Sequence, residues 1–483
     1  MSEQIVDAPS RTPAFDANHP PDRALIETCV HCGFCLPSCP TYALWGEEMD
    51  SPRGRIYLMN AGLDGRTAMS PAYVRHFDAC LGCMACVTAC PSGVQYSPLI
   101  EATRGQIERR YERSLTDRAF RAIIFALFPY PGRMRVALAP LALISGVGRL
   151  FQGRRRVRPE RVDRRESRGP DLDDAGRHTP TLFARLRAML ELAPTITWRS
   201  LRARTPERTA AIGERRLTVG LLTGCVQRVV FPQVNEATVA VLSAEGCDVV
   251  APRAQGCCGA LALHAGRLGE ARAFARHTIE VFDRSGVERI AVNAAGCGSS
   301  MKEYGQLLAD DRAWADRARA FSARVRDVSE VVADLGEPRA PRHRLALRVA
   351  YHDACHLAHA QGVRQQPRDL LRSIPGIELV PVAEPDLCCG SAGVYNLVEP
   401  RTAAELGRRA AAAVASTGAD AVVAANPGCL LQIGASAARR GDQLVGFHPV
   451  ELLDAALAGR DADALLRDRR ALIESAGRPR GAD

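Results

Sequence analysis

The sequence predicts a chain of mixed α+β and α/β class, in which a mostly helical N-terminal module precedes two copies of a small αβ domain. A run of four cysteines that closes on a proline occurs twice before residue 92 and predicts the first module. A second cysteine pattern, set where short apolar runs alternate with helical ones, recurs after about 130 residues and predicts the two copies. We expect a cysteine module at 1–110, a connector at 111–210, and the copies at 211–335 and 336–483.

The N-terminal module is defined by two cysteine runs, Cys29-x2-Cys32-x2-Cys35-x3-Cys39-Pro40 and Cys80-x2-Cys83-x2-Cys86-x3-Cys90-Pro91. This spacing is that of ferredoxin-type modules with two [4Fe-4S] clusters, in which the fourth cysteine of each run ligates the other cluster. The prediction is one cluster on Cys29, Cys32, Cys35 and Cys90, and a second on Cys80, Cys83, Cys86 and Cys39. Because such clusters carry single electrons, the chain is a candidate electron relay.

Structural zinc and disulfide bonds are the alternatives for these eight cysteines. Zinc sites use paired C-x2-C knuckles rather than four cysteines in one run that ends in Cys-Pro. Disulfides suit secreted chains, and residues 1–21 are polar, without an apolar segment of the secretory type. Seventeen cysteines in such a context favour metal binding in a reducing compartment, so we expect a cytoplasmic protein.

The connector is apolar in its first part and rich in arginine in its second. Prolines and arginines interrupt its most apolar stretch, Phe120 to Phe151, so no run of about 20 apolar residues remains to span a membrane. The stretch predicts core helices, or else an amphipathic surface that docks on a partner or on a membrane. Residues 154–180 combine many charges with Pro and Gly, which predicts a linker.

Each copy of the αβ domain carries one cysteine after a strand, an adjacent cysteine pair, and one cysteine after another strand. The two sets are Cys225, Cys257, Cys258 and Cys297, and Cys355, Cys388, Cys389 and Cys429. The gap before the pair is 31 residues in one copy and 32 in the other, and the gap after it is 38 and 39. Such positions fall at the carboxyl ends of parallel strands, where α/β domains build their sites.

These eight cysteines could hold a further iron–sulfur cluster or act as redox-active thiols, and the alternative is that they are buried and inert. Duplication of the whole set in register favours a role. His352 and His356 flank Cys355, so a metal-binding or proton-transfer role stands beside the simpler interpretation of structural histidines. Cys247 lies outside the pattern, and we expect it in the core.

Charge is a weaker signal. The net charge is +9, and Lys302 is the one lysine, so the positive charge is almost wholly arginine. A basic surface could favour an acidic partner subunit or anionic lipid head groups. Nucleic acid is not expected, because the arginines are dispersed, aromatic residues make up only 5% of the chain and no base-stacking motif occurs.

Several segments resemble the iron–sulfur subunit of glycolate oxidase (glycolate dehydrogenase). They are residues 29–42 (CVHCGFCLPSCPTY), 51–56 (SPRGRI), 90–94 (CPSGV), 388–397 (CCGSAGVYNL) and 426–429 (NPGC). The resemblance runs from Cys29 to about Leu453 and is weakest over 155–210. It implies an electron-transfer subunit without catalytic residues of its own, which works with FAD-binding partner subunits. There glycolate is oxidised to glyoxylate, and electrons pass through this chain to an acceptor such as membrane quinone. The implied location is the cytoplasm or the cytoplasmic face of the inner membrane.

The duplicated domains also resemble the CCG domains of the heterodisulfide reductase family, which carry noncubane clusters and end in C-x-x-C. Here Cys297 and Cys429 stand alone, although four ligands per copy remain. Other functions fit the same cysteine pattern: the iron–sulfur subunit of a lactate or glycerol-3-phosphate dehydrogenase, an autonomous disulfide reductase, or a zinc-stabilised scaffold. The run CCGSAG at 388–393 favours glycolate within this set.

Overall fold

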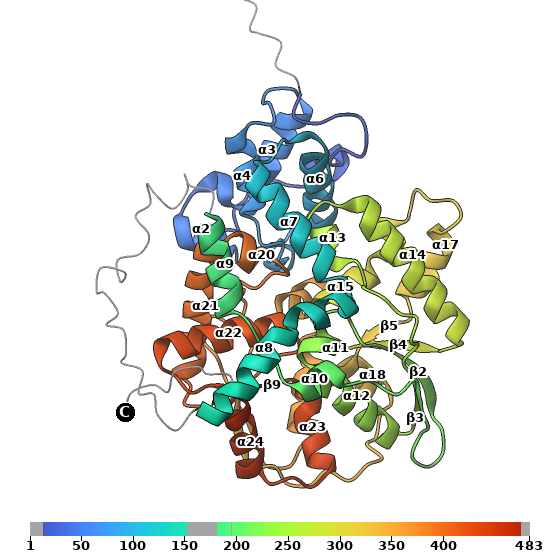
Figure 1. Ribbon diagram of the computed structural model, residues 1–483. Coiled ribbons are helices and arrows are strands. Elements are labelled where there is room, and N and C mark those ends of the chain that lie inside the picture. Colours follow the sequence, from blue (N-terminus) through green and yellow to red (C-terminus); the bar gives the residue numbers. More distant parts are fainter. Residues whose placement is uncertain (1–12, 152–180, 195, 475–483) are drawn as a thin grey trace, which may run out of the picture. The chain divides into compact units, whose positions relative to one another are not determined.

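The computed structural model describes residues 13–151, 181–194 and 196–474 (Figure 1). Its contacts divide the chain into a first unit, Met1–Ser114 with Leu263–Leu268, and a second unit, Leu115–Ala262 with Gly269–Asp483. The expected mixture of a helical module and duplicated αβ domains is confirmed. The linker predicted at 154–180 and the polar residues 1–12 lie outside the described residues.

The first unit is helical. Its elements are α1 (Arg23–Glu27), α2 (Pro40–Trp45), η1 (Glu48–Asp50), α3 (Pro52–Leu63), α4 (Pro71–Asp78), α5 (Ala85–Thr88) and α6 (Tyr96–Arg110). α2, α3 and α4 each begin with proline, whose fixed φ suits the first helical position. Ser51 and Ser70 cap α3 and α4 by accepting hydrogen bonds from the amides of Gly54 and Tyr73. Of these three helices, α2 begins directly after Cys39 and so fixes where the first cysteine run ends.

The second unit opens with the connector helices α7 (Leu115–Leu127), α8 (Pro131–Phe151), α9 (Leu182–Glu191) and α10 (Trp198–Arg202). α7 and α9 are joined by a buried ion pair, in which Arg185 Nη1 lies 2.8 Å from Asp117 Oδ1. Within the described residues no single helix has the length and apolarity to cross a membrane. α7 and residues Pro131–Pro140 of α8 reach that length and apolarity only when they are taken together, and the two segments are bent by 107° relative to each other.

Two parallel sheets follow, and their strand orders are equivalent. The first contains β1 (Arg208–Thr209), β2 (Leu217–Leu222), β3 (Cys247–Val250), β4 (Arg289–Val292) and β5 (Val325–Asp327) in the order β1-β3-β2-β4-β5. The second contains β6 (Leu347–Tyr351), β7 (Ile377–Val380), β8 (Ala421–Val423) and β9 (Val445–Phe447) in the order β7-β6-β8-β9. Only β1, paired with β3, is antiparallel. Without β1 the two sheets have the same topology, as duplication requires.

Helices connect the strands in both copies. In the first copy they are α11 (Gln227–Val230), α12 (Pro232–Ala244), α13 (Ala260–His264), α14 (Leu268–Ser285), α15 (Ala295–Lys302), α16 (Tyr304–Leu307), α17 (Ala315–Ser322) and α18 (Val328–Asp334). In the second they are the π-helical turn η3 (His356–Ala360), α19 (Gln365–Arg372), α20 (Tyr395–Val398), α21 (Pro400–Ala415), α22 (Pro427–Arg440), α23 (Pro449–Leu457) and α24 (Ala462–Glu474).

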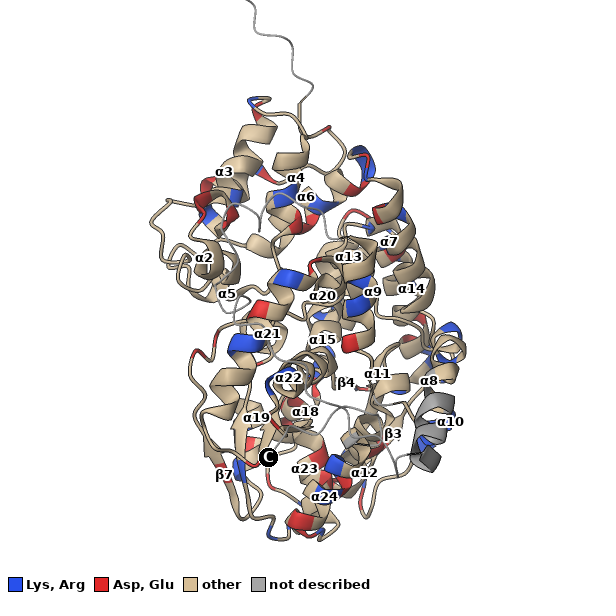
Figure 2. Ribbon diagram, turned by 60° about the vertical axis from the view of Figure 1, so that its left-hand side comes forward, with Lys and Arg blue, Asp and Glu red and all other residues tan. Residues whose placement is uncertain are grey.

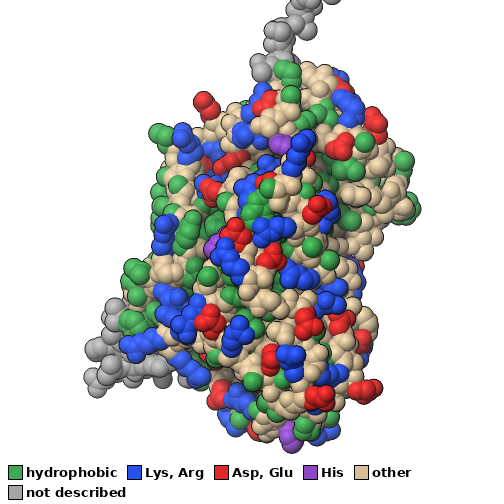
Figure 3. Space-filling view, turned by 90° about the vertical axis from the view of Figure 1, so that its right-hand side faces the viewer, with side chains coloured by type: hydrophobic (Ala, Val, Ile, Leu, Met, Phe, Trp, Pro, Cys, Tyr) green, Lys and Arg blue, Asp and Glu red, His purple; other side chains and the backbone are tan. Residues whose placement is uncertain are grey.

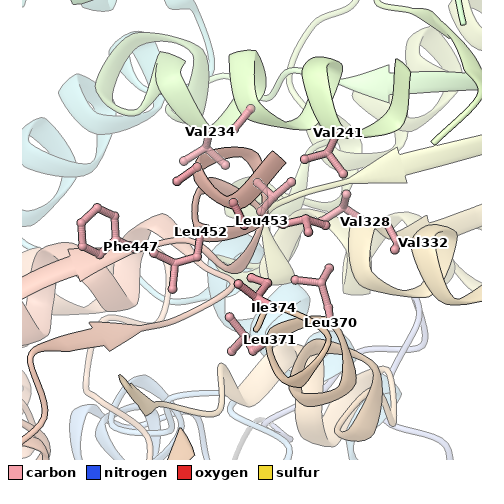
Figure 4. Close-up of a cluster of buried hydrophobic side chains, with 14 of the residues drawn as sticks. Val234, Val241, Val328, Val332, Leu370, Leu371, Ile374, Phe447, Leu452 and Leu453 are labelled. Atoms are coloured by element: carbon pink, nitrogen blue, oxygen red, sulfur yellow. The ribbon is translucent and has the colours of Figure 1, made fainter. Parts of the chain in front are cut away.

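The two copies share one buried core (Figure 4). α12 of the first copy packs on α23 of the second, and α18 of the first packs on α19 of the second. Because α12 and α19 occupy equivalent places in their copies, as do α18 and α23, the two contacts are related by an exchange of copies. Val241, Val328, Leu371 and Leu453 are among the buried side chains of this core. Each such side chain contributes about 1.5–3 kcal/mol relative to exposure, so neither copy is expected to be stable without the other.

Charges are dispersed over the molecule. Lys and Arg positions and Asp and Glu positions are scattered over the ribbon in Figure 2, and both signs are interspersed on the face shown in Figure 3. Neither view shows a basic stripe of the kind that tracks a phosphate backbone.

Candidate metal centres

In the first unit, Cys39, Cys80, Cys83 and Cys86 line one cavity, together with Arg55 and Tyr96 among others. These are the four cysteines that sequence spacing assigns to one cluster. Cys39, Cys80 and Cys83 are buried, and Cys86 is half-buried. Four soft sulfur donors around one cavity match the donor set of a [4Fe-4S] cluster, so the residues present fit that group.

The loop at this cavity follows from two left-handed residues. Gly82 has φ +65° and Met84 has φ +61°, which turns the chain tightly between Cys80 and Cys86. The turn also directs the amide of Gly82 toward Cys80 Sγ, at 3.4 Å. Amide donors to sulfur stabilise negative charge there and tune a cluster's potential.

A buried guanidinium adjoins the same cavity. Arg55 is 1% exposed, and its Nη1 lies 3.9 Å from Cys39 Sγ. Its other partners are the His76 carbonyl, Thr41 and Asp50, whose carboxylate is 3.4 Å away. Burial alone would raise the pKa of the Cys80 thiol, but Arg55 and Arg104 outweigh it and the pKa is lowered. These cations therefore favour the thiolate of Cys80, the form that binds metal, whereas burial raises the pKa of Cys86 in the same cavity.

The cysteines assigned to the other cluster lie in a more exposed loop. Cys32 is exposed, and Cys29, Cys35 and Cys90 are half-buried. Cys29 interacts electrostatically with Cys32, Cys35 and Cys90, which brings this set together as well. Burial is the main cause of the raised pKa of Cys29 and of Cys35. Ligation by either set stays a prediction.

Arg53 secures this exposed loop. Its guanidinium binds Glu48 through Nε and Nη2 and donates to the His31 carbonyl at 3.1 Å. His31 has φ +53°, an uncommon conformation for a non-glycine residue. Arg53 and Arg55, two residues apart at the start of α3, thus support the two cysteine sets separately.

In the second unit, the first copy brings its four cysteines into one row. Side-chain hydrogen bonds join Cys225 to Cys257, Cys257 to Cys258, and Cys258 to Cys297. The pKa values of Cys225, Cys257 and Cys258 are all raised by donation within this row and by burial. All three shifts favour the protonated thiol.

The second copy has an equivalent row with a different electrostatic character. Cys355 Sγ lies 3.8 Å from Cys388 Sγ, and the Cys389 side chain is hydrogen-bonded to those of Cys388 and Cys429. Hydrogen bonds from Cys355 and Cys389 hold the pKa of Cys388 well below its usual value. A hydrogen bond from Cys389, with help from His352 and Asn426, lowers the pKa of Cys429 to about 5. Hydrogen bonds to its neighbours and burial raise the pKa of Cys389, so the pKa shifts in this row have both signs, whereas those of Cys225, Cys257 and Cys258 are all upward.

Gly259 and Gly390 shape the cysteine pairs in the two copies. Both have strongly positive φ, +84° and +86°. A Cβ on Gly390 would lie 2.7 Å from the Ala403 carbonyl oxygen, so only glycine fits there. The Cys-Cys-Gly sequence is thus a turn that presents two adjacent sulfurs to one site.

His352 belongs to the second row. It follows β6, and its amide donates to the Val423 carbonyl at 2.8 Å, which extends the β6–β8 pairing. Its ring is hydrogen-bonded to Cys429. A ring nitrogen of His352 and the Sγ atoms of Cys389 and Cys429 all lie within 4.8 Å of one another. The sequence suggested a metal role for this histidine only as one of two interpretations. Its position directly after a buried strand was the available signal.

His356 and His359 lie in η3, a π-helical turn of a kind often found at functional sites. His356 Nδ1 is 3.5 Å from Cys355 Sγ, whereas His359 faces Arg364 and Asp386. The neighbouring Asp353 is tied to Arg368, 2.9 Å from its Nη1. His356 thus joins the row at its other end, and His359 does not join it.

Two further features lie apart from these centres. Cys247 is fully buried in the shared core, as expected from its place outside the repeat. A cavity of about 740 Å³ is lined by parts of α10, α12, α22, α23 and α24, and no cysteine lines it.

The residue that sequence reasoning missed in the first unit is Arg55. It lies in the segment SPRGRI, which was recognised only as a point of resemblance. A cation cannot be assigned to a sulfur site from spacing alone, because its burial depends on how α3 packs.

Comparison with known proteins supports this description of the chain. Residues 25–94 match a 4Fe-4S dicluster domain, and residues 219–302 and 349–434 each match a cysteine-rich domain. Residues 116–163 match the linker region of the glycolate oxidase iron–sulfur subunit.

Whole-chain relatives agree. The chain is 37% identical to the "Probable glycolate oxidase iron-sulfur subunit" of Bacillus subtilis, over 89% of this chain and 94% of that protein. It is 34% identical to the "Glycolate oxidase iron-sulfur subunit" of Escherichia coli, over 90% and 95%. "Lactate utilization protein A" of an Exiguobacterium species is 29% identical but matches only 49% of this chain. This chain therefore belongs to the family of glycolate oxidase iron–sulfur subunits.

Proposed function

We propose that this chain relays electrons from FAD-binding partner subunits, which oxidise glycolate to glyoxylate, toward a quinone acceptor. The observation that carries the proposal is the cavity in which Cys39, Cys80, Cys83 and Cys86 converge beside Arg55. A [4Fe-4S] cluster bound there, and a second bound by Cys29, Cys32, Cys35 and Cys90, would take up and release one electron at a time. The relatives that match the whole chain support glycolate as the source of those electrons.

The chain's own residues divide the work between the two cysteine sets. The loop around Cys32 is exposed and carries Phe34, an apolar side chain 68% exposed, which suits contact with a partner subunit. We assign electron entry to this loop. The set around Cys39 is buried, so its surroundings exclude water, and Arg55 supplies a fixed positive charge.

Metal analysis and spectroscopy test this proposal on anaerobically purified protein. We expect about eight irons and eight acid-labile sulfides per chain, with the EPR signals of paired cubanes after reduction. Zinc without iron would contradict it. With the flavin subunits present, glycolate should reduce these centres. If lactate reduces them instead, the alternative of a lactate dehydrogenase subunit is correct.

We propose further that the connector docks on an anionic membrane surface. The connector face consists of exposed apolar side chains on α7, α8 and α9 and at their junction: Leu115, Ile123, Tyr130, Val136, Phe183, Leu186 and Leu190. The three helices lie on the side of Figure 1 nearest the viewer. Phe183 is 76% exposed and Val136 is 75% exposed, which is uncommon for side chains of this size on a surface facing only water.

The charges around the connector face favour lipid as its occupant. Arg118, Arg133 and Arg187 are exposed on these helices. The acidic residues of α7 and α9, Asp117 and Glu191, are both paired with arginines. Apolar side chains flanked by arginine, without free acid, are the pattern of helices that lie in a bilayer interface. This face would place the chain at the inner surface of the membrane, near a quinone acceptor.

Co-sedimentation with phosphatidylcholine vesicles, with and without phosphatidylglycerol, tests this second proposal. We expect binding that needs the anionic lipid and that is lost in Val136→Glu/Phe183→Glu. Ile212→Glu is a matched control, since Ile212 is 65% exposed outside these helices. Unchanged vesicle binding in the double variant, or loss of the flavin subunits instead, would show that the face serves another purpose.

A further inference from the structure

Arginines converge at the carboxyl edge of the first sheet. Thr223 directly follows β2, and residues 251–255 directly follow β3. A pocket of about 270 Å³ lies there, and its lining includes Arg135 of α8, Arg204 after α10 and Arg228 of α11. The helices α8, α10 and α11 pack against one another (Figure 1). The carboxyl ends of parallel strands are where α/β domains bind ligands, so we examine this arginine pocket as a binding site.

The arginine pocket has an excess of positive charge. Burial lowers the pKa of Arg135, and the neighbouring Arg204 lowers it further. Burial also lowers the pKa of Arg228, and Arg135 adds to this effect, whereas Cys225 opposes it. The guanidinium groups are therefore partly desolvated and lie within electrostatic range of one another. Glu236 is the one carboxylate among the described residues that line the pocket, and it is exposed.

The structure uses only some of the hydrogen-bond donors of these arginines. Arg228 donates through Nε and Nη2 to the carbonyls of Gly224 and Gln255. Arg204 Nη1 donates to backbone carbonyls at the end of α10. Arg135 Nε is buried, and no acceptor among the described residues lies within hydrogen-bond distance of it. Because a buried charged donor without an acceptor is costly, an oxygen supplied by a ligand would stabilise this pocket.

The second copy neutralises the equivalent edge with carboxylates of its own. Thr223 lies two residues before the first cysteine of its copy, where the second copy has Asp353. Gln255 lies two residues before the cysteine pair, where the second copy has Asp386. An arginine of the second copy binds each of these carboxylates. The first copy has neutral side chains at both positions, so its arginines depend on an anion from outside the chain.

We propose that the arginine pocket binds a small dianion, a phosphate or a dicarboxylate, through Arg135, Arg204 and Arg228. The planar fork of a guanidinium matches the paired oxygens of both groups. These three cations against the one carboxylate of Glu236 leave two positive charges, which a dianion neutralises. Arg253 also lines the pocket, but it is paired with a glutamate that does not.

The size of the pocket agrees with a small ligand. Its volume of about 270 Å³ is below the range of about 300–1,000 Å³ that is typical of pockets for drug-sized molecules. All of its lining residues belong to the second unit. The proposal is therefore independent of cluster binding in the first unit and does not rest on the relay function.

Isothermal titration calorimetry on the anaerobically purified full-length chain tests the proposal, with inorganic phosphate, malonate and glycolate as probes. We expect one phosphate or one malonate per chain, and at least about tenfold weaker binding of glycolate, which carries a single charge. The tighter of the two dianions identifies the ligand as phosphorylated or dicarboxylic. Arg135→Gln should weaken binding about 10- to 150-fold, the effect of losing one charge-assisted hydrogen bond.

Matched variants separate ligand binding from stability. Arg202→Gln should bind like the wild type, because Arg202 is exposed on α10 and does not line the pocket. Without added anion, Arg135→Gln should not lower the unfolding temperature, since it removes a partly buried cation beside Arg204. If Arg135→Gln is unstable, Arg204→Gln at its exposed position should show the same loss of affinity with an intact fold. The cubane EPR signals should be unchanged in all three variants.

Four results would overturn the proposal. The first is no binding of phosphate or malonate at millimolar concentration. The second is wild-type affinity in both Arg135→Gln and Arg204→Gln, and the third is an equal loss in Arg202→Gln, which would indicate a general effect of charge. The fourth is abolished binding of Arg135→Gln to phosphatidylglycerol vesicles, which would assign the pocket to a lipid phosphodiester. Failure of the relay proposal would look different, because it would remove the cubane signals themselves.

Discussion

Replacing Arg55 with glutamine should lower the reduction potential of the buried cluster. The guanidinium lies 3.9 Å from Cys39 Sγ and is 1% exposed. At that distance, and with an effective dielectric constant of about 20, two unit charges interact with about 4 kcal/mol. Because reduction adds negative charge to the cluster, loss of the cation makes reduction less favourable.

Two features of the site reduce that interaction. The added electron is spread over the cluster, and the Asp50 carboxylate, 3.4 Å from Arg55, offsets part of its charge. We take a quarter to a half of the Coulomb value, about 1–2 kcal/mol. Since a factor of ten is 1.36 kcal/mol and 59 mV for one electron, the expected fall is about 45–90 mV.

An EPR-monitored redox titration measures this shift. Arg66→Gln is the control, because Arg66 is half exposed and binds Asp64. Removing one partner of a buried pair costs about 3–5 kcal/mol, although Asp50 retains His76 at 2.9 Å. Asp50→Asn/Arg55→Gln, which avoids the unpaired carboxylate, keeps the measurement feasible if the single variant is unstable. Full iron content with both potentials equal to those of Arg66→Gln would refute this reasoning.

The remaining predictions concern stability and metal content. Cys247→Ala should keep all iron and lose about 1 kcal/mol of unfolding free energy, since it only removes a core contact. Cys39→Ala should lose cluster iron. Equal iron contents in Cys39→Ala and Cys247→Ala would contradict the assignment of Cys39 as a cluster ligand. Asn293→Leu should cost about 2–3 kcal/mol in urea unfolding, because Gln227, Asn235 and Thr238 lose their buried partner; a smaller loss than in Cys247→Ala would be unexpected. Burial lowers the pKa of His448 to about 3, and its Nδ1 caps α23 by accepting from the Val450 amide. The unfolded chain therefore binds a proton that the folded chain does not, and stability should fall as pH drops from about 6.5 toward 3, by at most about 5 kcal/mol. His448→Asn, which can still cap, should flatten this dependence, whereas His343→Asn should not.

Spacing along the chain was enough to identify the cysteine sets. The loops that carry Cys29 to Cys35 and Cys80 to Cys86 are local, so the positions of cysteines with two residues between them are fixed by a few backbone angles. The cross-assignment of Cys39 relied on the known arrangement of such modules, and the cavity that contains it agrees with that choice. The duplication was equally visible, because matched gaps between cysteines reflect matched strands and helices.

The partners of those cysteines could not be read from spacing. Arg55 is polar and next to a glycine, and nothing local distinguishes it from Arg53, which is partly exposed and binds Glu48. The His352 ring reaches Cys429 only because β6 and β8 are neighbours in the sheet. From the sequence, an ordinary structural histidine was the simpler interpretation of His352 and a metal ligand was the alternative, because the strand pairing could not be read from spacing.

The sequence by itself determined the family, the two cysteine runs and the duplicated cysteine pattern, because these depend on spacing along the chain. The tertiary structure decided that α12 packs on α23 and α18 on α19, so that two copies share one core. It also decided which charged and imidazole groups stand beside the sulfurs. Both outcomes depend on contacts between residues tens to hundreds of positions apart, and such contacts are set by packing of whole faces rather than by any local preference of the chain.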